Sequence, residues 1–350
     1  MSTTPCRLVR NAALGACAML LLAHRPALAA DTLTFILGDK TPPLMNSLNL
    51  IAQGAGFYQD EHLTVTTILV DGTDKVVPAC ARGEADICPI GIEAAIQAYD
   101  QGLHMKMFLT RASKFGYVIA VLQDSPIKTL ADLKGKTIGV HTLTGSSPVL
   151  TTQSALATVG LKPADYSLVG VGMEDSAANA LSSGKVDAAA LPLYELIPYI
   201  VGGLKLRIFR HPTLKNSSNA GYLASNSILA TKREAVGHFA RAIVKASLLA
   251  HYHPDAAARA MLSAAGKPFT PEDVQRRTAE LNAWQDDLPA ADPENRRIGA
   301  PSLPGMQAYL DILEQAGAVK AHIPVTDIAT DELVAVANNF DRKAIRNYAK

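Results

Sequence analysis

The feature that most constrains the fold is a short pattern that the chain contains twice. A glycine, two further residues, an aspartate and an apolar run occur at residues 83–91 (GEADICPIG) and again at residues 184–192 (GKVDAAALP). Each copy follows a helix-like stretch, residues 75–81 and 177–181. A glycine suits the left-handed position just beyond a helix end, and a short apolar run bounded by turn residues is typical of a buried strand. Two copies of this helix-to-strand turn predict two similarly built lobes.

The N-terminus has the pattern of a secretory signal peptide. Two arginines in the first ten residues precede an apolar run at residues 12–23, which is short for a membrane-spanning helix. Small residues follow within residues 26–30, at the positions that a signal peptidase reads. We predict that residues 1–29 are a signal peptide, cleaved after Ala29 or Ala30, and that the protein is exported. An uncleaved membrane anchor is the alternative.

Length and charge narrow the class of protein. About 320 residues remain after cleavage, enough for one large domain or two medium ones. Removal of the three signal-peptide arginines changes the net charge from +1 to −2. Such a near-neutral balance argues against a nucleic-acid partner, and aromatic residues make up only 5% of the chain, without interleaved basic runs.

Two cysteines stay in the mature chain. Cys6 and Cys17 leave with the signal peptide, whereas Cys80 and Cys88 remain. In an exported protein such a pair can form a disulfide, and two small buried thiols are the other interpretation. We expect no metal site. The run at residues 251–253 (HYH) is better explained by histidines that suit the negative end of a helix.

The rest of the mature chain alternates strands and helices, which predicts sheets that are largely parallel and flanked by helices. Residues 57–61 are expected to form a polar turn, and residues 117–123 a strand that crosses between lobes. The predicted strands are residues 32–37, 63–70, 86–90, 105–110, 117–123, 136–141, 166–171, the run after 187, 204–209 and 224–231. The predicted helices are residues 42–54, 75–81, 92–101, 129–133, 146–159, 175–181, 233–251, a helix that starts at 270 and 304–317.

Five segments in order resemble a known family, the NMT1-like periplasmic solute-binding proteins of ABC importers. This group binds nitrate, sulfonates, taurine and thiamine-pyrimidine precursors. The segments are residues 54–63 (GAGFYQDEHL), 83–87 (GEADI), 132–140 (DLKGKTIGV), 184–189 (GKVDAA) and 226–231 (NSILAT). The resemblance covers nearly the whole mature chain.

The resemblance implies an α/β fold of the type II periplasmic-binding-protein class. Two mixed, mainly parallel sheets with flanking helices would be joined by two crossover strands. Lobe 1 would comprise residues 30–118 plus 222–350, and lobe 2 residues 119–221.

The implied function is capture of a small anionic or polar organic compound in the periplasm and its delivery to a membrane permease with its ATPase. The expected protein is a monomer without a cofactor. Two alternatives stay open. One is an enzyme on the same fold, either desulfinase-like with Cys88 as nucleophile or pyrimidine-synthase-like. The other is a periplasmic ligand-sensing subunit.

Candidate ligand-binding residues follow the predicted strands, because ligands of open α/β sheets sit beyond the carboxyl ends of the strands. Arg111 would pair with a carboxylate or sulfonate, unless it is a solvated loop arginine. Tyr194 would stack on or hydrogen-bond the ligand, and Glu195 would accept from a ligand amine, unless it forms an ion pair within the protein. The remaining candidates of these strand ends are Lys40, Thr41, Ile90 and Gly91.

The turn at residues 144–147 precedes a predicted helix. Its free backbone N–H groups and hydroxyls could converge on an anion. The alternative is plain N-capping by Ser146 or Ser147. The candidates in this turn are Thr144, Gly145, Ser146 and Ser147.

Overall fold

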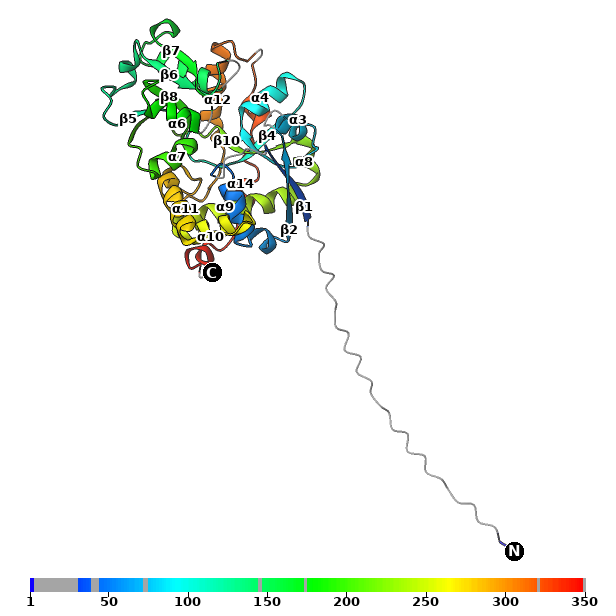
Figure 1. The fold of residues 1–350 in the computed structure, drawn as a ribbon. Helices are drawn as coiled ribbons and strands as arrows, with labels where there is room; N and C mark the ends of the chain where they lie inside the picture. The colour runs from blue at the N-terminus through cyan, green and yellow to red at the C-terminus, as the bar shows by residue number, and fades with distance from the viewer. Residues whose placement is uncertain are drawn as a thin grey trace.

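The structure is a computed structural model that describes residues 1–2, 31–38, 44–71, 75–143, 147–172, 175–319 and 322–348. Residues 3–30, almost all of the predicted signal peptide, lie outside the described residues. In the described part, strands and helices alternate up to residue 225, and helices follow (Figure 1).

Two groups of strands divide the molecule, and the first we name lobe 1. In it β1 (Asp31–Gly38) pairs in parallel with β2 (Leu63–Val70). β10 (Ala220–Ser225) lies between β3 (Cys88–Gly91) and β4 (Met105–Thr110) and is antiparallel to both. A parallel bridge between Phe35 and Ile87 connects these two sheets. The resulting order is β2-β1-β3-β10-β4.

The second group, which we name lobe 2, is one five-stranded sheet. Its order is β7 (Ser167–Gly170), β6 (Thr137–Val140), β8 (Ala188–Pro192), β5 (Tyr117–Leu122) and β9 (Leu206–Arg210). β6 is parallel to both of its neighbours, whereas β5 is antiparallel to β8 and β9. The sheets are therefore mixed, as predicted. They are also mainly parallel, as predicted, because four of the five strands in each order run in one direction and β10 or β5 runs in the other.

The two lobes repeat one construction, which confirms the inference from the doubled sequence pattern. β3 and β8 occupy the same place in their sheets: β3 lies between β1 and the oppositely directed β10, and β8 lies between β6 and the oppositely directed β5. Gly83 and Gly184 both adopt left-handed conformations, with φ of 73° and 74°. Only glycine takes this backbone conformation at little cost, so its presence after each preceding helix is explained.

The aspartate of each pattern joins the turn to a neighbouring strand, β1 in lobe 1 and β6 in lobe 2. The Asp86 carboxylate accepts a hydrogen bond from the Thr34 backbone N–H at 2.7 Å, and the Asp86 N–H donates to the Thr34 carbonyl at 3.1 Å. Asp187 and Thr137 make the same two contacts in lobe 2, at 2.8 and 2.9 Å. The exchange fixes the register of the turn against the strand.

The two aspartates differ in burial, which predicts different costs of removal. Asp86 is buried and also pairs with Lys232 at 2.9 Å, whereas the Asp187 side chain is 42% exposed. Asp86→Ala is expected to lower the free energy of unfolding by about 2–3 kcal/mol, since it leaves buried donors unpaired. Asp187→Ala should cost less than about 1 kcal/mol, because water replaces an exposed carboxylate. Urea denaturation of both variants measures this, and equal or inverted losses would contradict it.

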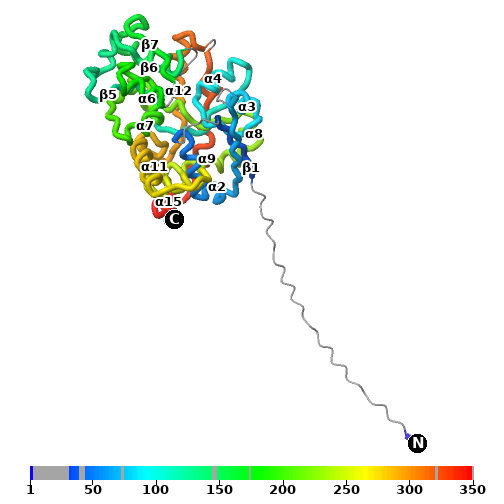
Figure 2. Tube along the Cα trace, in the orientation of Figure 1, coloured from blue at the N-terminus to red at the C-terminus, as the bar shows by residue number. Residues whose placement is uncertain are grey.

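Helices cover both lobes. Lobe 1 carries α1 (Ser47–Gly54), α2 (Phe57–Asp60), α3 (Val76–Ala81), α4 (Glu93–Asp100) and α8 (Asn226–Thr231); lobe 2 carries α5 (Ser147–Ala157), α6 (Asp175–Ser182) and α7 (Leu193–Val201). The C-terminal part contributes α9 (Arg233–Tyr252), α10 (Pro254–Ala264), α11 (Pro271–Trp284), α12 (Leu303–Gln315), α13 (Val325–Ile328), α14 (Val334–Ala337) and α15 (Arg342–Arg346). The colours of Figure 2 show the C-terminal helices beside both lobes, and α11 contacts α7.

The core of lobe 1 centres on α9. Phe239 is fully buried, and its ring lies 5.9 Å from Phe35, 5.7 Å from Tyr58 and 5.3 Å from Tyr222. The predicted helix at 233–251 is confirmed as α9, and its apolar side chains meet those of β1 and β10. Rings at such distances add to the energy of their burial.

Two local predictions were wrong. The expected polar turn at 57–61 is the short helix α2, whose Phe57 and Tyr58 are buried. The expected strand at 224–231 ends at Ser225, and residues 226–231 form α8. Ser225 accepts a hydrogen bond from the Ile228 N–H, and this N-cap starts a helix in spite of the apolar run.

The chain passes between the lobes twice, through residues 111–116 and 211–219. Gly116 N–H donates to the Asn219 side-chain oxygen at 3.1 Å, which holds the two connections together. β5 begins two residues before the predicted lobe boundary at 119. β10 likewise begins two residues before the predicted boundary at 222. The boundaries themselves stay a prediction.

The second connection begins with a buried histidine. His211 Nδ1 accepts hydrogen bonds from the N–H groups of Thr213 and Leu214, both at 3.2 Å. The ring proton therefore belongs on Nε2, which lies 3.0 Å from Ser154 Oγ of lobe 2. Burial lowers the pKa of His211 to about 4, because charging the ring costs its solvation.

This histidine predicts a loss of stability in mild acid. Above pH 6.5 both the folded and unfolded states hold neutral His211. Between pH 6.5 and about 4 the unfolded state alone takes up the proton, so the free energy of unfolding falls, by up to about 3 kcal/mol. His211→Asn keeps an acceptor for the two N–H groups and does not titrate. Urea denaturation at pH 7.5, 6 and 5 should show a shallower decline for the variant, and identical declines would refute this origin.

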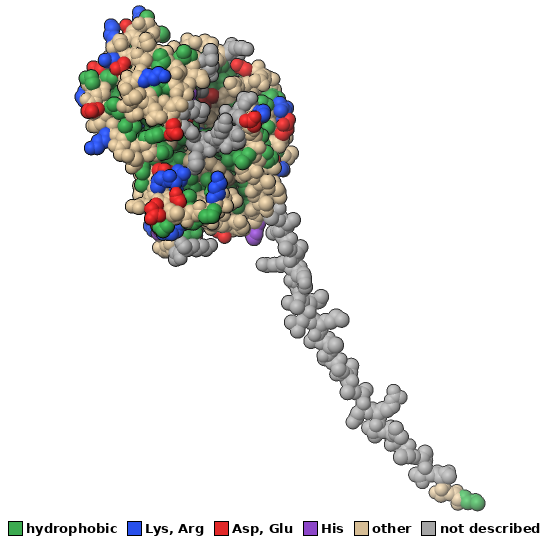
Figure 3. All heavy atoms as spheres, in the orientation of Figure 1, with side chains coloured by type: hydrophobic (Ala, Val, Ile, Leu, Met, Phe, Trp, Pro, Cys, Tyr) green, Lys and Arg blue, Asp and Glu red, His purple; other side chains and the backbone are tan. Residues whose placement is uncertain are grey.

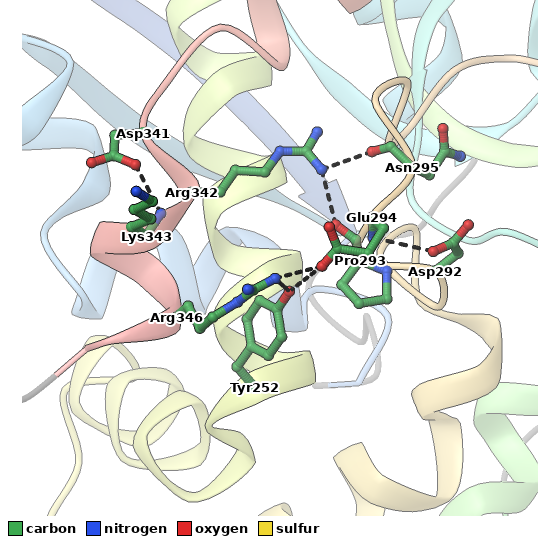
Figure 4. A network of polar contacts seen from close by, with 9 residues as sticks. All are labelled: Tyr252, Asp292, Pro293, Glu294, Asn295, Asp341, Arg342, Lys343 and Arg346. Atoms are coloured by element: carbon green, nitrogen blue, oxygen red, sulfur yellow. Dashed lines mark hydrogen bonds and ion pairs between the residues drawn. The ribbon is translucent and has the colours of Figure 1, made fainter.

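The C-terminal segment closes against the end of α9 (Figure 4). Arg346 contacts the carboxylate of Glu294 and the hydroxyl of Tyr252, and its guanidinium lies 5.3 Å from the Tyr252 ring centroid. Arg342 donates to the carbonyls of Pro293 and Asn295 at 2.9 and 2.8 Å. The loop at 292–295 is thereby fixed between α9 and α15.

The outer surface carries charges of both signs. On the face in Figure 3, basic and acidic side chains are interspersed among the coloured residues. In the described part of the chain, no helix is both long and apolar enough to cross a membrane.

Candidate functional site

A cavity of about 620 Å³ lies between the lobes. Lobe 1 supplies its walls from α3, the end of β3 and α4, and lobe 2 from the junction of β8 and α7. Both connections border it, through Gly116 and Asn219. The site therefore sits where strands of both lobes end and the chain crosses, as the strand-end rule predicts.

Among the described residues that line the cavity, Arg111 carries the positive charge. It follows β4 directly and is only 5% exposed, which excludes the alternative of a solvated loop arginine. Its Nη1 donates to the Met45 carbonyl at 3.1 Å, and its guanidinium lies 5.6 Å from the Tyr194 ring centroid. Among the described residues, its Nε has no hydrogen-bond partner. A buried guanidinium with an unsatisfied N–H is ready to bind an anion.

The contact between Arg111 and Tyr194 joins the two lobes at the cavity. Tyr194 lies in the first turn of α7, directly after β8. A guanidinium near an aromatic face gains cation–π attraction, more so where water is excluded. Both predicted residues therefore line one site, from opposite sides.

Glu93, which sequence reasoning missed, is the acidic group of the cavity. It lies in the first turn of α4, and its Oε1 accepts hydrogen bonds from Asn219 Nδ2 at 2.9 Å and from the Tyr309 hydroxyl at 2.8 Å. Desolvation raises the pKa of Glu93, and the hydrogen bonds from Asn219 and Tyr309 together with the charge of Arg111 oppose this rise.

The Glu93 carboxylate occupies space that is free because Gly91 has no side chain. A Cβ at position 91 would lie 2.1 Å from Glu93 Oε2, too close for any real contact. The group that comes close to this candidate glycine is therefore the protein's own carboxylate. Ile90, the neighbouring candidate, also lines the cavity.

Glu195 is not at the cavity. Its side chain is 4% exposed, and Oε2 lies 3.0 Å from His141 Nε2, at the end of β6. The predicted alternative, an ion pair or hydrogen bond within the protein, describes it. The helical turn sends the side chains of two consecutive residues in different directions, so Tyr194 faces the cavity and Glu195 faces lobe 2.

Several candidates lie outside the described residues: Lys40, Thr41, Thr144, Gly145 and Ser146. Ser147 is the first residue of α5. Their predicted roles at an anion site stay predictions.

The wall that α3 forms is apolar, with Val77, Pro78 and Ala81. α4 adds the apolar Ala94 and Ala98 together with Glu93 and the polar Gln97. A ligand with an alkyl or aryl body fits against α3, beside the polar groups.

Cys80 and Cys88 form a disulfide, which settles the two interpretations that the sequence left open. The bond closes the helix-to-strand turn of lobe 1, between α3 and β3. Both cysteines are fully buried.

The missed residues could be found only in part from the sequence. Glu93 follows the end of β3 by two positions, so the strand-end rule extended by one helical turn reaches it. Asn219 and Tyr309 lie 126 and 216 positions away from Glu93, and no local pattern marks them.

Comparison with known proteins gives relatives of the same fold. A thiamine biosynthesis protein of Haemophilus influenzae is 24% identical over 288 residues, 81% of this chain and 86% of that protein. The periplasmic aliphatic sulphonate-binding protein SsuA of Escherichia coli superposes with a TM-score of 0.65 at 18% identity, covering 85% of this chain and 97% of that one.

The periplasmic nitrate-binding protein NrtA of Synechocystis PCC 6803 also gives a TM-score of 0.65, at 12% identity and 91% coverage of both chains. The fold is thus that of periplasmic binding proteins. The family model described as NMT1/THI5-like matches residues 47–257, more than half of the chain. The chain belongs to the NMT1/THI5-like family.

Proposed function

We propose that the protein is the periplasmic substrate-binding component of an ABC-type importer. It captures a small anionic or polar organic compound between its lobes and delivers it to a membrane permease with its ATPase. The observation that carries the proposal is Arg111, a buried cation at the cavity with an unsatisfied Nε–H that touches lobe 2 through Tyr194.

The position of the cavity between the two lobes supports a binding role. A ligand that contacts Arg111 of lobe 1 and Tyr194 of lobe 2 binds more tightly when the lobes are closed, so it shifts the population toward the closed form. A permease can recognise that form. Relatives of the same fold include proteins named for binding aliphatic sulphonates and nitrate, both anions, which supports an anionic ligand group.

Binding, with no catalysis, is part of the proposal. The cysteine-dependent alternative needs a thiolate at Cys88, and the bond to Cys80 leaves no thiol there. We propose a monomer that is exported through its signal peptide. A sensing role would use the same cavity and differ only in the membrane partner.

The position of Arg111 predicts that the protein binds an anionic ligand and that substitution of Arg111 weakens this binding. Purified mature protein would be titrated with nitrate, alkanesulfonates, aromatic sulfonates and aromatic carboxylates, by thermal shift and then by calorimetry. At least one class should raise the melting temperature. Arg111→Gln should weaken its binding by about 10- to 100-fold, the usual worth of a hydrogen bond to a charged group.

Arg259→Gln is the matched control. Arg259 is an exposed arginine of α10 that pairs with Asp255, away from the cavity, and its substitution should leave affinity unchanged. Binding that is insensitive to Arg111→Gln would refute the anion site. Turnover of a bound compound by the intact protein would refute the binding-only role.

A further inference from the structure

We propose that the disulfide between Cys80 and Cys88 positions the apolar wall that α3 forms, so that affinity for a ligand with an alkyl or aryl body depends on this bond. The bond connects α3 to the start of β3. Neither cysteine is among the residues that line the cavity, so both act through α3 as positioning residues. This inference rests on the proposed function and identifies what holds one wall of its site in place.

The second copy of the helix-to-strand turn has the same backbone and no disulfide. In each copy the glycine N–H donates to the carbonyl three residues earlier, at 3.0 Å in lobe 1 and 3.1 Å in lobe 2. Counted from this glycine, Leu181 and Ala189 of lobe 2 correspond to Cys80 and Cys88 of lobe 1. Both are buried apolar residues. A leucine and an alanine are therefore enough to fold this turn, and the turn alone does not explain the bond.

The helices that precede the two turns differ in what they contact. In lobe 2, Ala178 of α6 lies in the core and is 2% exposed. The corresponding residue of α3 is Val77, which is partly buried and lines the cavity together with Pro78. Among the described residues, none from α6 lines this cavity. The disulfide thus occurs in the copy whose helix presents part of its apolar surface to the ligand.

A short helix that presents apolar surface to a cavity is held only weakly by packing. α3 has six residues, of which Val76, Cys80 and Ala81 are buried. A helix of this length has little stability of its own. The bond ties its last turn to β3, which the exchange between Asp86 and Thr34 holds in register. The wall therefore keeps its shape before a ligand arrives, and binding does not have to order it.

Two forms of the intact mature protein without the bond test the inference. The first is the wild-type chain unfolded in urea and refolded with tris(2-carboxyethyl)phosphine, which keeps both side chains and removes only the bond. The second is Cys80→Leu/Cys88→Ala, which introduces the pair that lobe 2 has at these positions. Phe239→Leu is the control. It weakens lobe 1 through an apolar cluster that contains neither cysteine, and it keeps the bond.

Hydrogen exchange of the ligand-free protein measures the order of the wall directly. In both forms without the bond, the amides of residues 79–84 should exchange at least about 10-fold faster than in the oxidised protein, because α3 opens locally. The amides of residues 180–185, the corresponding segment of lobe 2, should keep their exchange rates. Phe239→Leu should not reproduce this selective increase.

Affinity should change with the same selectivity. The ligand pairs are methanesulfonate with butanesulfonate, and acetate with benzoate; within each pair the anionic group is the same and only the apolar body differs. Loss of the bond should weaken binding of the larger member of at least one pair by about 10-fold, part of the contribution that burial of its apolar surface makes. The smaller member should lose less than about 2-fold. A general loss of stability would weaken both members alike.

The outcomes separate this inference from the proposed function. Unchanged exchange of α3 without the bond overturns the inference, as does an equal loss of affinity for both members of a pair; binding by the oxidised protein then leaves the proposed function standing. Failure of both bond-free forms to fold, or faster exchange in both segments alike, assigns the bond to the fold as a whole and overturns the inference too. Absence of binding by all four compounds to the oxidised protein also overturns it, and the proposed function then stands or falls with the wider panel of anions.

Discussion

Both lobes depend on one exchange of hydrogen bonds, between the aspartate that follows a left-handed glycine and a threonine in a neighbouring strand, β1 in lobe 1 and β6 in lobe 2. Asp86 meets Thr34 in this way and Asp187 meets Thr137. The glycine ends a helix, the aspartate turns the chain, and the exchange sets the register of the next strand. β3 and β8 thus end at the cavity edge of their sheets, where Gly91, the last residue of β3, and Tyr194, two residues after β8, line the site.

The site combines residues from strand ends and helix starts of both lobes. Arg111 comes from the end of β4 and Tyr194 from the start of α7, so the contact between them spans the two lobes. Glu93 lies two residues beyond β3, at the start of α4, and Asn219 ties it to the connections between lobes. The charged groups of the cavity are therefore linked directly to the segments about which lobe motion would occur.

Sequence patterns predicted regular elements well where a local physical cause existed. The strand at 105–110 matched to the residue, and the helix predicted to start at 270 begins there, with Thr270 as its N-cap. Residues 226–231 show the limit, since their apolar run suits a strand as well as a helix. The Ser225 hydroxyl decided the outcome through a single hydrogen bond. Glu195 shows a second limit of sequence patterns. Its position next to Tyr194 in the sequence does not indicate the direction in which either side chain points.

The sequence by itself determined the doubled helix-to-strand turn, the mixed α/β architecture and a cationic residue at a strand end. These follow from local rules: glycine tolerates a positive φ, apolar runs seek burial, and strand ends meet at one edge. Only the tertiary structure decided that Cys80 bonds Cys88, that Glu195 turns away from the cavity and that Glu93 turns toward it. Each of these outcomes depends on partners that the fold brings close, such as Tyr309, which lies 216 positions from Glu93. The whole fold offsets the entropy cost of closing such a long loop, and a local sequence pattern contains no information about it.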